Sequence, residues 1–285
     1  HDTANMNYLT GYDAWSFYYA QCVLVHINED EPICFVRSQD GGGAYIKTYL
    51  QDKNIIEYDE KYIHTWPLHP YQYLAEIIKK RKWDKLNIGL EMDSHYFTAF
   101  CYETIKNNLP NAKLKDAERL VNWVRVIKSN KEIKLIQSAA RIVESAMKTA
   151  FESINPGVRQ CDAVADIQKA LFNGTKEFGG DYPSIATLLP TGKGTSAAHL
   201  THTDEKFVSG EATIIEIAGA YKRYHCPMAR TVLLGKKDQK KIDTMKATNE
   251  ALNAGIEATK PGNTVDDVAQ KFWGVLDKHK IKKDS

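Results

Sequence analysis

The sequence predicts a two-domain α/β protein, and three observations support this prediction. The chain has 285 residues, more than one typical domain needs to bury a core. Short β-rich runs alternate with helical stretches up to residue 117, whereas a long helical periodicity begins at residue 130. The second part also contains an internal repeat. We therefore expect a small α/β domain over residues 1–117 and a second domain over residues 118–285.

The first domain is expected to combine paired strands with two helices. Residues 21–27 and 31–37 are β-rich and flank the turn-like sequence NEDE, which favours a pair of strands, and residues 86–92 form another such run. Residues 71–83 and 95–109 carry apolar side chains at helical spacing. Strands and helices in this order indicate a small α/β domain.

The second domain is expected to begin with two helices and to continue with strands. From residue 130, apolar side chains recur at three- and four-residue steps and predict a long amphipathic helix that ends at INPG. A second helix is expected at about residues 160–178. Strand-like runs follow at residues 184–190, 212–221 and 230–235.

An internal repeat links two stretches of the second domain. Residues 144–171 and 249–276 both show a helix, a Pro-Gly stop and a second helix. This indicates a pseudo-symmetric domain. Strands follow the first copy, whereas the second copy stops at Ser285, directly after its helices. We expect the domain to be incomplete at its C-terminus, with the natural protein continuing or a separate chain completing the sheet.

The composition limits the choice of partner. Lys and Arg number 38 and Asp and Glu 36, so the net charge of +2 indicates neither nucleic acid nor a membrane surface. A small-molecule or peptide ligand fits better. Five scattered cysteines without a CxxC motif indicate neither a disulfide framework nor a zinc knuckle. No apolar run approaches the ~20 residues of a membrane helix. These features predict a cytoplasmic protein with reduced thiols.

Three residues of the second domain are candidates for chemistry. Glu216 stands between Ile215 and Ile217 in a strand-like run, so its side chain points to the opposite face from theirs. His199 precedes a turn, with His202 as a weaker candidate nearby, and Arg230 closes the sequence PMAR. Taken alone, a glutamate, a histidine and an arginine indicate acid, base or nucleophilic work. A solvated role remains open for Glu216, and a surface or hydrogen-bonded role for His199.

Several motifs together resemble the creatinase, prolidase and aminopeptidase P superfamily. These are YLTGY, VRVIKSNKEIKLIQSAARI and INPG, followed by H-x(10)-G-x(5)-acid-x-x-G and Y-x(5)-RT. The resemblance covers essentially the whole chain. It implies a creatinase-like N-terminal domain followed by a catalytic domain of the pita-bread fold, which is built from two related halves and so accounts for the repeat.

The resemblance also bears on metal binding. Metallopeptidases of this superfamily hold two divalent metals with an Asp at the place of Glu216 and a second Asp eleven residues later, at the place of Pro227. Proline has no side-chain donor, and hard divalent ions are held by anionic oxygens. The remaining ligands of the family would lie after Ser285. We therefore expect no metal and no other cofactor.

The closer resemblance is to the ectoine hydrolase branch. It rests on YLTGYDAWSFYYAQ, on EPICFVRSQDGGGA and on EIAG combined with HCPMART. It implies that Glu216 is a nucleophile on the amidine carbon of ectoine and that the product is an N-acetylated 2,4-diaminobutyrate. Creatinase, which is metal-free, implies an acid–base role for His199. Arg230 is a candidate for binding the substrate carboxylate, although a structural role is equally open.

The aromatic tract GYDAWSFYY has two interpretations. Tyr12, Trp15 and Phe17 either pack in the core of the small domain or line the cleft, where aromatic faces attract a compact cation. In related dimers the small domain of one subunit closes over the site of the other, so the resemblance implies a homodimer. Two other functions remain open: a metal-dependent Xaa-Pro dipeptidase or aminopeptidase, and a non-catalytic pita-bread binding protein.

Overall fold

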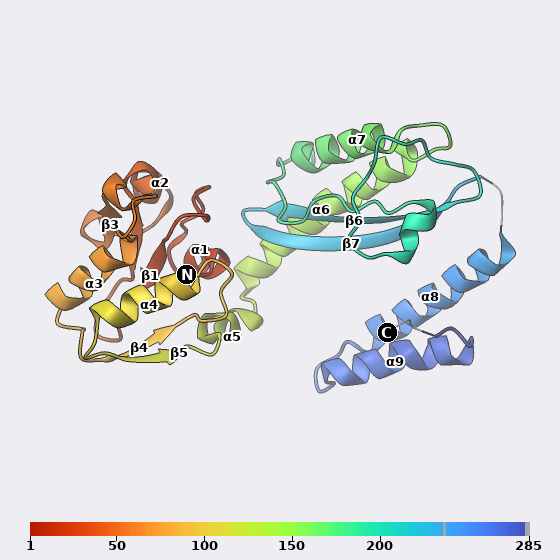
Figure 1. Cartoon of the computed structure of the whole chain (residues 1–285). Coiled ribbons are helices and arrows are strands. Elements are labelled where there is room, and N and C mark those ends of the chain that lie inside the picture. The colour runs from red at the N-terminus through yellow and green to blue at the C-terminus, as the bar shows by residue number, and fades with distance from the viewer. Residues whose placement is uncertain (236–237, 283–285) are drawn as a thin grey trace. The chain divides into compact units, whose positions relative to one another are not determined.

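The chain forms two compact units, His1–Ser129 and Asn130–Ser285 (Figure 1). The computed structural model describes residues 1–235 and 238–282. The division comes after residue 129, whereas the sequence pattern placed it after residue 117.

The twelve residues between these two boundaries belong to the first unit. They include the short helix α5 (Leu120–Val126). The side-chain oxygen of Asn122 accepts a hydrogen bond from Asn5 at 2.9 Å, and Arg125 donates to Asn5 at 2.5 Å. These contacts cross more than a hundred residues of sequence, so local periodicity could not indicate them.

The first unit contains two small sheets. One has the strand order β1-β2-β3, with β1 antiparallel and β3 parallel to β2, and the other is the parallel pair β4-β5. The predicted strands and helices are confirmed, and each is shorter than predicted. The elements are α1 (Thr3–Thr10), β1 (Cys22–Leu24), β2 (Ile33–Arg37), α2 (Ser38–Lys47), β3 (Ile55–Tyr58), α3 (Pro70–Lys80), β4 (Asn87–Leu90), α4 (Ala99–Asn108) and β5 (Lys113–Asp116), with 3-10 turns at η1 (Asp52–Asn54) and η2 (Glu60–Tyr62).

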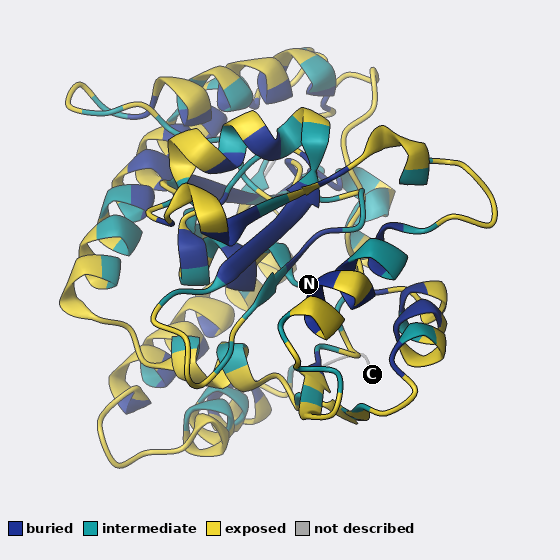
Figure 2. Cartoon of the chain, turned by 90° about the vertical axis from the view of Figure 1, so that its left-hand side faces the viewer, coloured by how far each residue is buried: buried dark blue, intermediate teal, exposed yellow. Residues whose placement is uncertain are grey.

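The core of the first unit is built around β2. Its residues 33–36 are fully buried, whereas the surfaces of the surrounding helices are exposed (Figure 2). A strand buried on both faces reads as a continuous apolar run, which is how ICFV appears in the sequence.

The second unit packs two helices on one face of a β-hairpin (Figure 1). The long helix and the strand at 212–221 are confirmed. The second helix ends at residue 173, five residues early, because Gly174 adopts φ 65° and closes it. The elements are α6 (Asn130–Ser153), α7 (Gln160–Asn173), η3 (Gly192–Ser196), β6 (Ala212–Tyr221), β7 (Tyr224–Leu233), α8 (Gln239–Ala258) and α9 (Val265–Lys278).

Two strand predictions in the second unit need correction. Residues 184–190 form no regular strand and contribute only an isolated bridge between Leu188 and Glu216. The strand predicted at 230–235 begins earlier, because β7 starts at Tyr224 and includes Pro227.

The two faces of the hairpin differ in what covers them. Ile215 and Ile217 are buried against α6 and α7. Gly219 lies on the same face, where an added Cβ would stand 2.2 Å from the carbonyl oxygen of Ala139 on α6. Glycine is therefore required for the close approach of helix and sheet. The alternate residues of β6 and β7, including Glu216, project from the opposite face.

Backbone hydrogen bonds fix how Pro227 fits into this ladder. The N–H and C=O of Glu216 both bond to Leu188, so they point away from β7. Hydrogen-bonded and non-hydrogen-bonded pairs alternate along an antiparallel ladder. Ala218 and Pro227 are two positions along from Glu216 and Ala229, so they too form a non-hydrogen-bonded pair, and their backbone nitrogen and C=O groups point away from the partner strand. The donor that proline lacks would thus point away from β6, and the ladder loses no bond.

The two copies of the sequence repeat form two helix pairs of the same order. α6 and α7 are separated by Pro156-Gly157, and α8 and α9 by Pro261-Gly262, with both glycines at positive φ. The second pair has a small core of its own around Ala251, with Val275 and Leu276. The repeat predicted from sequence is therefore present in the helices.

Candidate functional site

Glu216 lies on the face of the hairpin that α6 and α7 leave uncovered. It pairs with Ala229 on β7 and bridges to Leu188 on its other side. The residue is half-buried, and among the described residues its carboxylate has no hydrogen-bond or ion-pair partner. The adjacent pair on this face consists of Ala218 and Pro227. A carboxylate among small side chains is open to a ligand.

His199 follows the turn η3 and is exposed. Its neighbour Leu200 accepts a hydrogen bond from the N–H of Leu189 at 3.0 Å, and Leu188 is in turn paired with Glu216. The segment of His199 therefore lies two inter-strand distances from the segment of Glu216, and each such distance is about 5 Å, which places the two backbones about 10 Å apart. The backbone of His199 has φ 63°, a left-handed conformation uncommon for residues other than glycine. Such strain is often found at functional sites.

Arg230 lies on the other face of the hairpin. Its register partner is Ile215, and the two alternate neighbours of Arg230 on β7, Met228 and Val232, pack against the core beneath α6. The guanidinium donates to the carbonyl of Ala229 at 2.7 Å. Arg230 and Glu216 therefore project from opposite faces of the same sheet.

Tyr12 packs in the core of the first unit. It is 2 % exposed, and its hydroxyl lies 2.8 Å from that of Ser16, which donates to Gln21. Burial raises the pKa of Tyr12 to about 12. Of the two interpretations of the aromatic tract, core packing describes this residue.

Trp15 and Phe17 occupy a different environment. Trp15 is 60 % exposed and meets the half-buried ring of Phe17 edge to face, with the ring centres 5.0 Å apart. Tyr18 and Tyr96 each contact Phe17 as well. These four rings form an aromatic cluster at the surface of the first unit.

Sequence reasoning missed a polar pair on the Glu216 face. His225 of β7 pairs with Ala220, and its ring contacts Ser184. Alternation within β7 would have identified His225, because it stands two positions before Pro227 and therefore shares its face. Ser184 could not be found in this way, since it belongs to an irregular segment.

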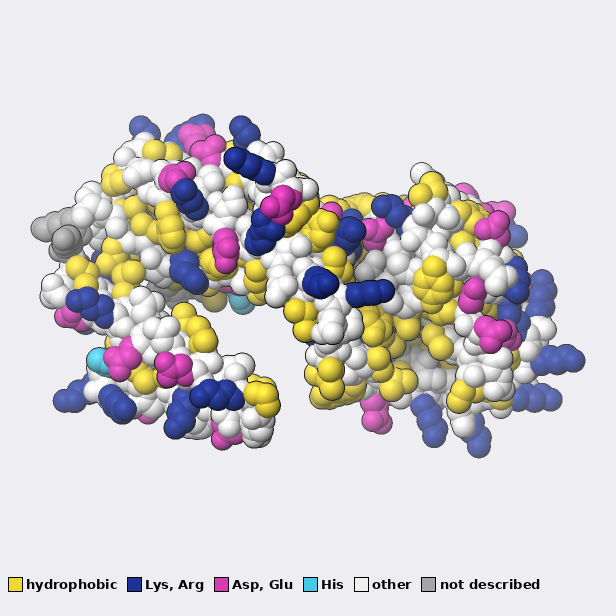
Figure 3. All heavy atoms as spheres, turned by 180° about the vertical axis from the view of Figure 1, so that it is seen from behind, with side chains coloured by type: hydrophobic (Ala, Val, Ile, Leu, Met, Phe, Trp, Pro, Cys, Tyr) yellow, Lys and Arg dark blue, Asp and Glu magenta, His cyan; other side chains and the backbone are white. Residues whose placement is uncertain are grey.

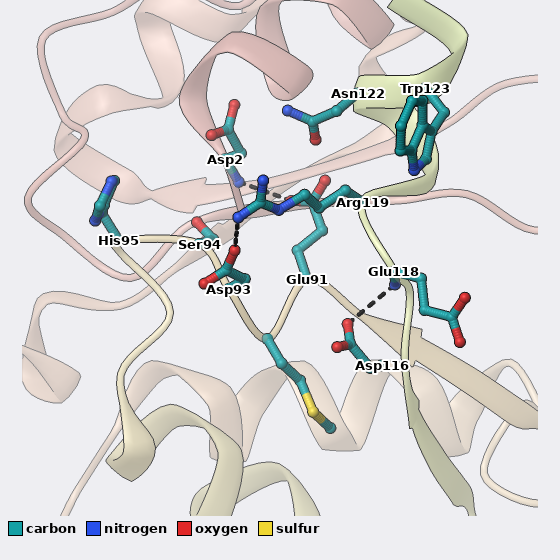
Figure 4. A pocket seen from close by; sticks show the side chains of 11 residues that line it. Asp2, Glu91, Asp93, Ser94, His95, Asp116, Glu118, Arg119, Asn122 and Trp123 are labelled. Atoms are coloured by element: carbon teal, nitrogen blue, oxygen red, sulfur yellow. Dashed lines mark hydrogen bonds and ion pairs between the residues drawn. The ribbon is translucent and has the colours of Figure 1, made fainter. Parts of the chain in front are cut away.

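The first unit contains a pocket of about 780 Å³, shown in Figure 4. Acidic side chains dominate its lining, which includes Glu91, Asp93 and Asp116. Arg119 forms an ion pair with Asp93 there. None of the residues predicted to carry chemistry lines this pocket.

Few metal-binding donors surround Glu216 on its face of the hairpin. Leu188, Ala229 and Pro227 offer no side-chain oxygen or nitrogen, and Thr231 carries a neutral hydroxyl. Within residues 1–235 and 238–282, no group of three His, Cys, Asp or Glu side chains could hold a metal ion.

Two known families match this sequence. Residues 134–285 match metallopeptidase family M24, and residues 1–127 match the creatinase/prolidase N-terminal domain. The chain belongs to family M24 and to the wider superfamily of pita-bread creatinases and prolidases.

Individual relatives differ in how similar they are to this chain. The chain is 42 % identical to the ectoine hydrolase of Halomonas elongata over 98 % of its own length and 71 % of that protein. It is 24 % identical to the Xaa-Pro dipeptidase of Pyrococcus furiosus, over 81 % of the chain and 66 % of the relative. The prolidase of Thermococcus sibiricus superposes with a TM-score of 0.82 at 17 % identity, over 98 % of this chain and 72 % of that one. The last similarity concerns the fold.

Lys and Arg side chains are spread among acidic ones on the face drawn in Figure 3, without a continuous basic patch there. In the described part of the chain, the helices are too short or too polar to span a bilayer.

Proposed function

We propose that this protein opens the ring of ectoine or of a closely related cyclic amidine, with Glu216 as nucleophile and without a metal. The observation that carries the proposal is the pairing on the open face of the hairpin. Glu216 stands there beside Ala229, and the place of the family's second carboxylate holds Pro227. The 42 % identity to an ectoine hydrolase supports the same choice of substrate.

The chemistry suits a carboxylate that has no hydrogen-bond or ion-pair partner among the described residues. Ectoine carries a delocalised amidinium, so Glu216 can first pair with the cation and then add to its electron-poor carbon. The bond from this carbon to one ring nitrogen breaks, and that nitrogen leaves with a proton. Water then attacks the same carbon and releases Glu216, which leaves an acetamide on the other nitrogen. The covalent step divides one hydrolysis into two easier ones.

His199 is proposed to move the protons of both steps. It would give a proton to the departing nitrogen and then take one from the attacking water, as a histidine does in general acid–base catalysis. The support is its position on a strained turn that is tied through Leu189 to the segment beside Glu216. Arg230 is proposed to have a structural role, because its side chain starts from the opposite face.

The test is hydrolysis of ectoine by the full-length protein in the presence of EDTA. We expect ring opening to survive chelation and to fall at least about a thousandfold in Glu216→Gln, which keeps the size of the side chain but not its charge. The matched control is Glu211→Gln, a carboxylate just before the same strand. Acetylated product would be followed by mass spectrometry.

Two results would contradict the proposal. Activity that disappears on chelation and returns with manganese would indicate the metal-dependent Xaa-Pro peptidase instead. Wild-type protein that opens no cyclic amidine and cleaves no Xaa-Pro peptide, but binds peptides, would indicate a non-catalytic member of the superfamily.

A further inference from the structure

Ser184 and His225 form a hydrogen-bonded pair that the proposed chemistry does not use. The Nε2 atom of His225 lies 3.0 Å from the backbone nitrogen of Ser184 and 3.1 Å from its hydroxyl. The Nδ1 atom lies 3.0 Å from the carbonyl oxygen of Arg223. A carbonyl only accepts and an amide N–H only donates, so His225 is the neutral tautomer with its proton on Nδ1.

This arrangement leaves the hydroxyl of Ser184 available. The Nε2 atom has one lone pair, and the backbone N–H of Ser184 already donates to it. The hydroxyl can therefore turn toward a ligand without leaving a buried acceptor unsatisfied. Ser184 is exposed, so a ligand can reach it.

The pair lies on the same face of the sheet as Glu216. His225 is opposite Ala220 on β6, four residues beyond Glu216, and only the pair Ala218 and Pro227 stands between them. Four residues of strand span about 13 Å. A six-membered ring bearing one carboxylate, with a polar contact of about 3 Å at each end, has a length of this order.

We propose that the hydroxyl of Ser184 donates a hydrogen bond to the carboxylate of the substrate and that His225 is the positioning residue that holds Ser184 in place. The inference rests on the proposed function, and it assigns a binding residue to the carboxylate end of the substrate, which Glu216 does not contact. The hydroxyl of Ser184 can bind the substrate carboxylate because its partner His225 is on the same face of the hairpin as Glu216, whereas the side chain of Arg230 starts from the opposite face.

The test uses two substrates that differ only in the carboxylate: ectoine, and 2-methyl-1,4,5,6-tetrahydropyrimidine, which keeps the amidinium ring. In the full-length protein, Ser184→Ala should raise KM for ectoine about ten- to hundredfold, the loss expected for a hydrogen bond to a charged group, with kcat nearly unchanged. For the analogue, kcat/KM should not change. Ser184→Thr keeps a hydroxyl and should restore most of the affinity for ectoine.

His225→Gln should raise KM for ectoine in the same direction. The control is Ser138→Ala, which removes the hydroxyl of a half-buried serine that donates to the carbonyl of Lys134 within α6. Thermal unfolding of each variant shows whether it folds.

The possible outcomes separate the inference from the proposed function. If the wild type opens ectoine and Ser184→Ala does so with unchanged KM, the inference is wrong and the proposed function stands. Equal losses on both substrates would indicate a structural role and would also overturn it. A wild type that opens neither ring overturns the proposed function and this inference together.

Discussion

At the scale of single residues, burial changes the acid–base behaviour of Tyr12. Its phenol is 2 % exposed and its pKa is raised to about 12 by burial. In the unfolded chain a tyrosine loses its proton near pH 10. The unfolded state therefore ionises first as the pH rises, and the stabilisation present below pH 10 is lost through pH 12.

We predict that the free energy of unfolding falls by up to about 2–3 kcal/mol between pH 10 and pH 12 on account of Tyr12. Other buried tyrosines, including Tyr58, act in the same direction. Tyr12→Phe should weaken this pH dependence, as measured by urea unfolding at several alkaline pH values. Tyr18→Phe removes an exposed phenol and serves as the control. Equal pH dependence in the wild type and Tyr12→Phe would contradict the prediction.

The sequence predicted the positions of some candidate residues on the hairpin better than those of others. Alternation showed that Glu216 opposes Ile215 and Ile217, but only the packing of α6 decided which face is open. The same alternation separates Arg230 from Pro227 by an odd number of residues, so their opposite faces were predictable once one strand was known to contain both. The partnership of Ser184 and His225 spans 41 residues and follows from tertiary structure alone.

At the scale of elements, the contact between α6 and β6 depends on one glycine. An added Cβ on Gly219 would lie 2.2 Å from the oxygen of Ala139 and 2.8 Å from the nitrogen of Val143. Both are backbone atoms of a helix, so neither can turn aside as a side chain would.

We predict that Gly219→Ala destabilises the protein by roughly 1–3 kcal/mol, because helix and sheet must separate. Gly274→Ala is the matched control: it is an exposed glycine in α9 with no atom within 4 Å of an added Cβ. Alanine there should stabilise the helix by up to about 1 kcal/mol. Denaturant unfolding measures both changes, and a neutral Gly219→Ala would contradict the packing described here.

Element boundaries show where local patterns fail. The sequence predicted β6 within its observed bounds, since ATIIEIAGAY contains β-branched residues and a tyrosine and no proline. It placed the start of β7 six residues late, because HCPMA contains a proline and is less β-rich. Proline is acceptable at that position because the missing donor points away from β6. The direction in which a backbone N–H points within a sheet depends on strand pairing, so it cannot be inferred from local composition.

At the scale of the whole molecule, the surface aromatic cluster suggests an association between copies. Trp15 is 60 % exposed and rests on Phe17, although large aromatic rings are costly to leave in water. Family resemblance implies a dimer in which this part of one subunit approaches the other. We therefore expect a homodimer that uses Trp15.

Sedimentation velocity at several protein concentrations tests this expectation. Trp15→Glu should raise the dissociation constant of the dimer at least about tenfold, the effect of losing one anchoring aromatic. The control is Trp66→Glu. Trp66 is another exposed tryptophan, lies in a different loop from Trp15 and stacks on Phe100 of α4, so its replacement should leave the dimer intact. A wild type that sediments as a monomer, or equal effects of the two substitutions, would contradict the prediction.

The place of Pro227 in the hairpin has a consequence for how such proteins diverge. An acidic residue and a proline satisfy the ladder equally well there, because the position donates no hydrogen bond to β6. A lineage could therefore exchange one for the other without passing through an unstable intermediate. A replacement at that position could therefore change the reaction chemistry without a cost in folding stability.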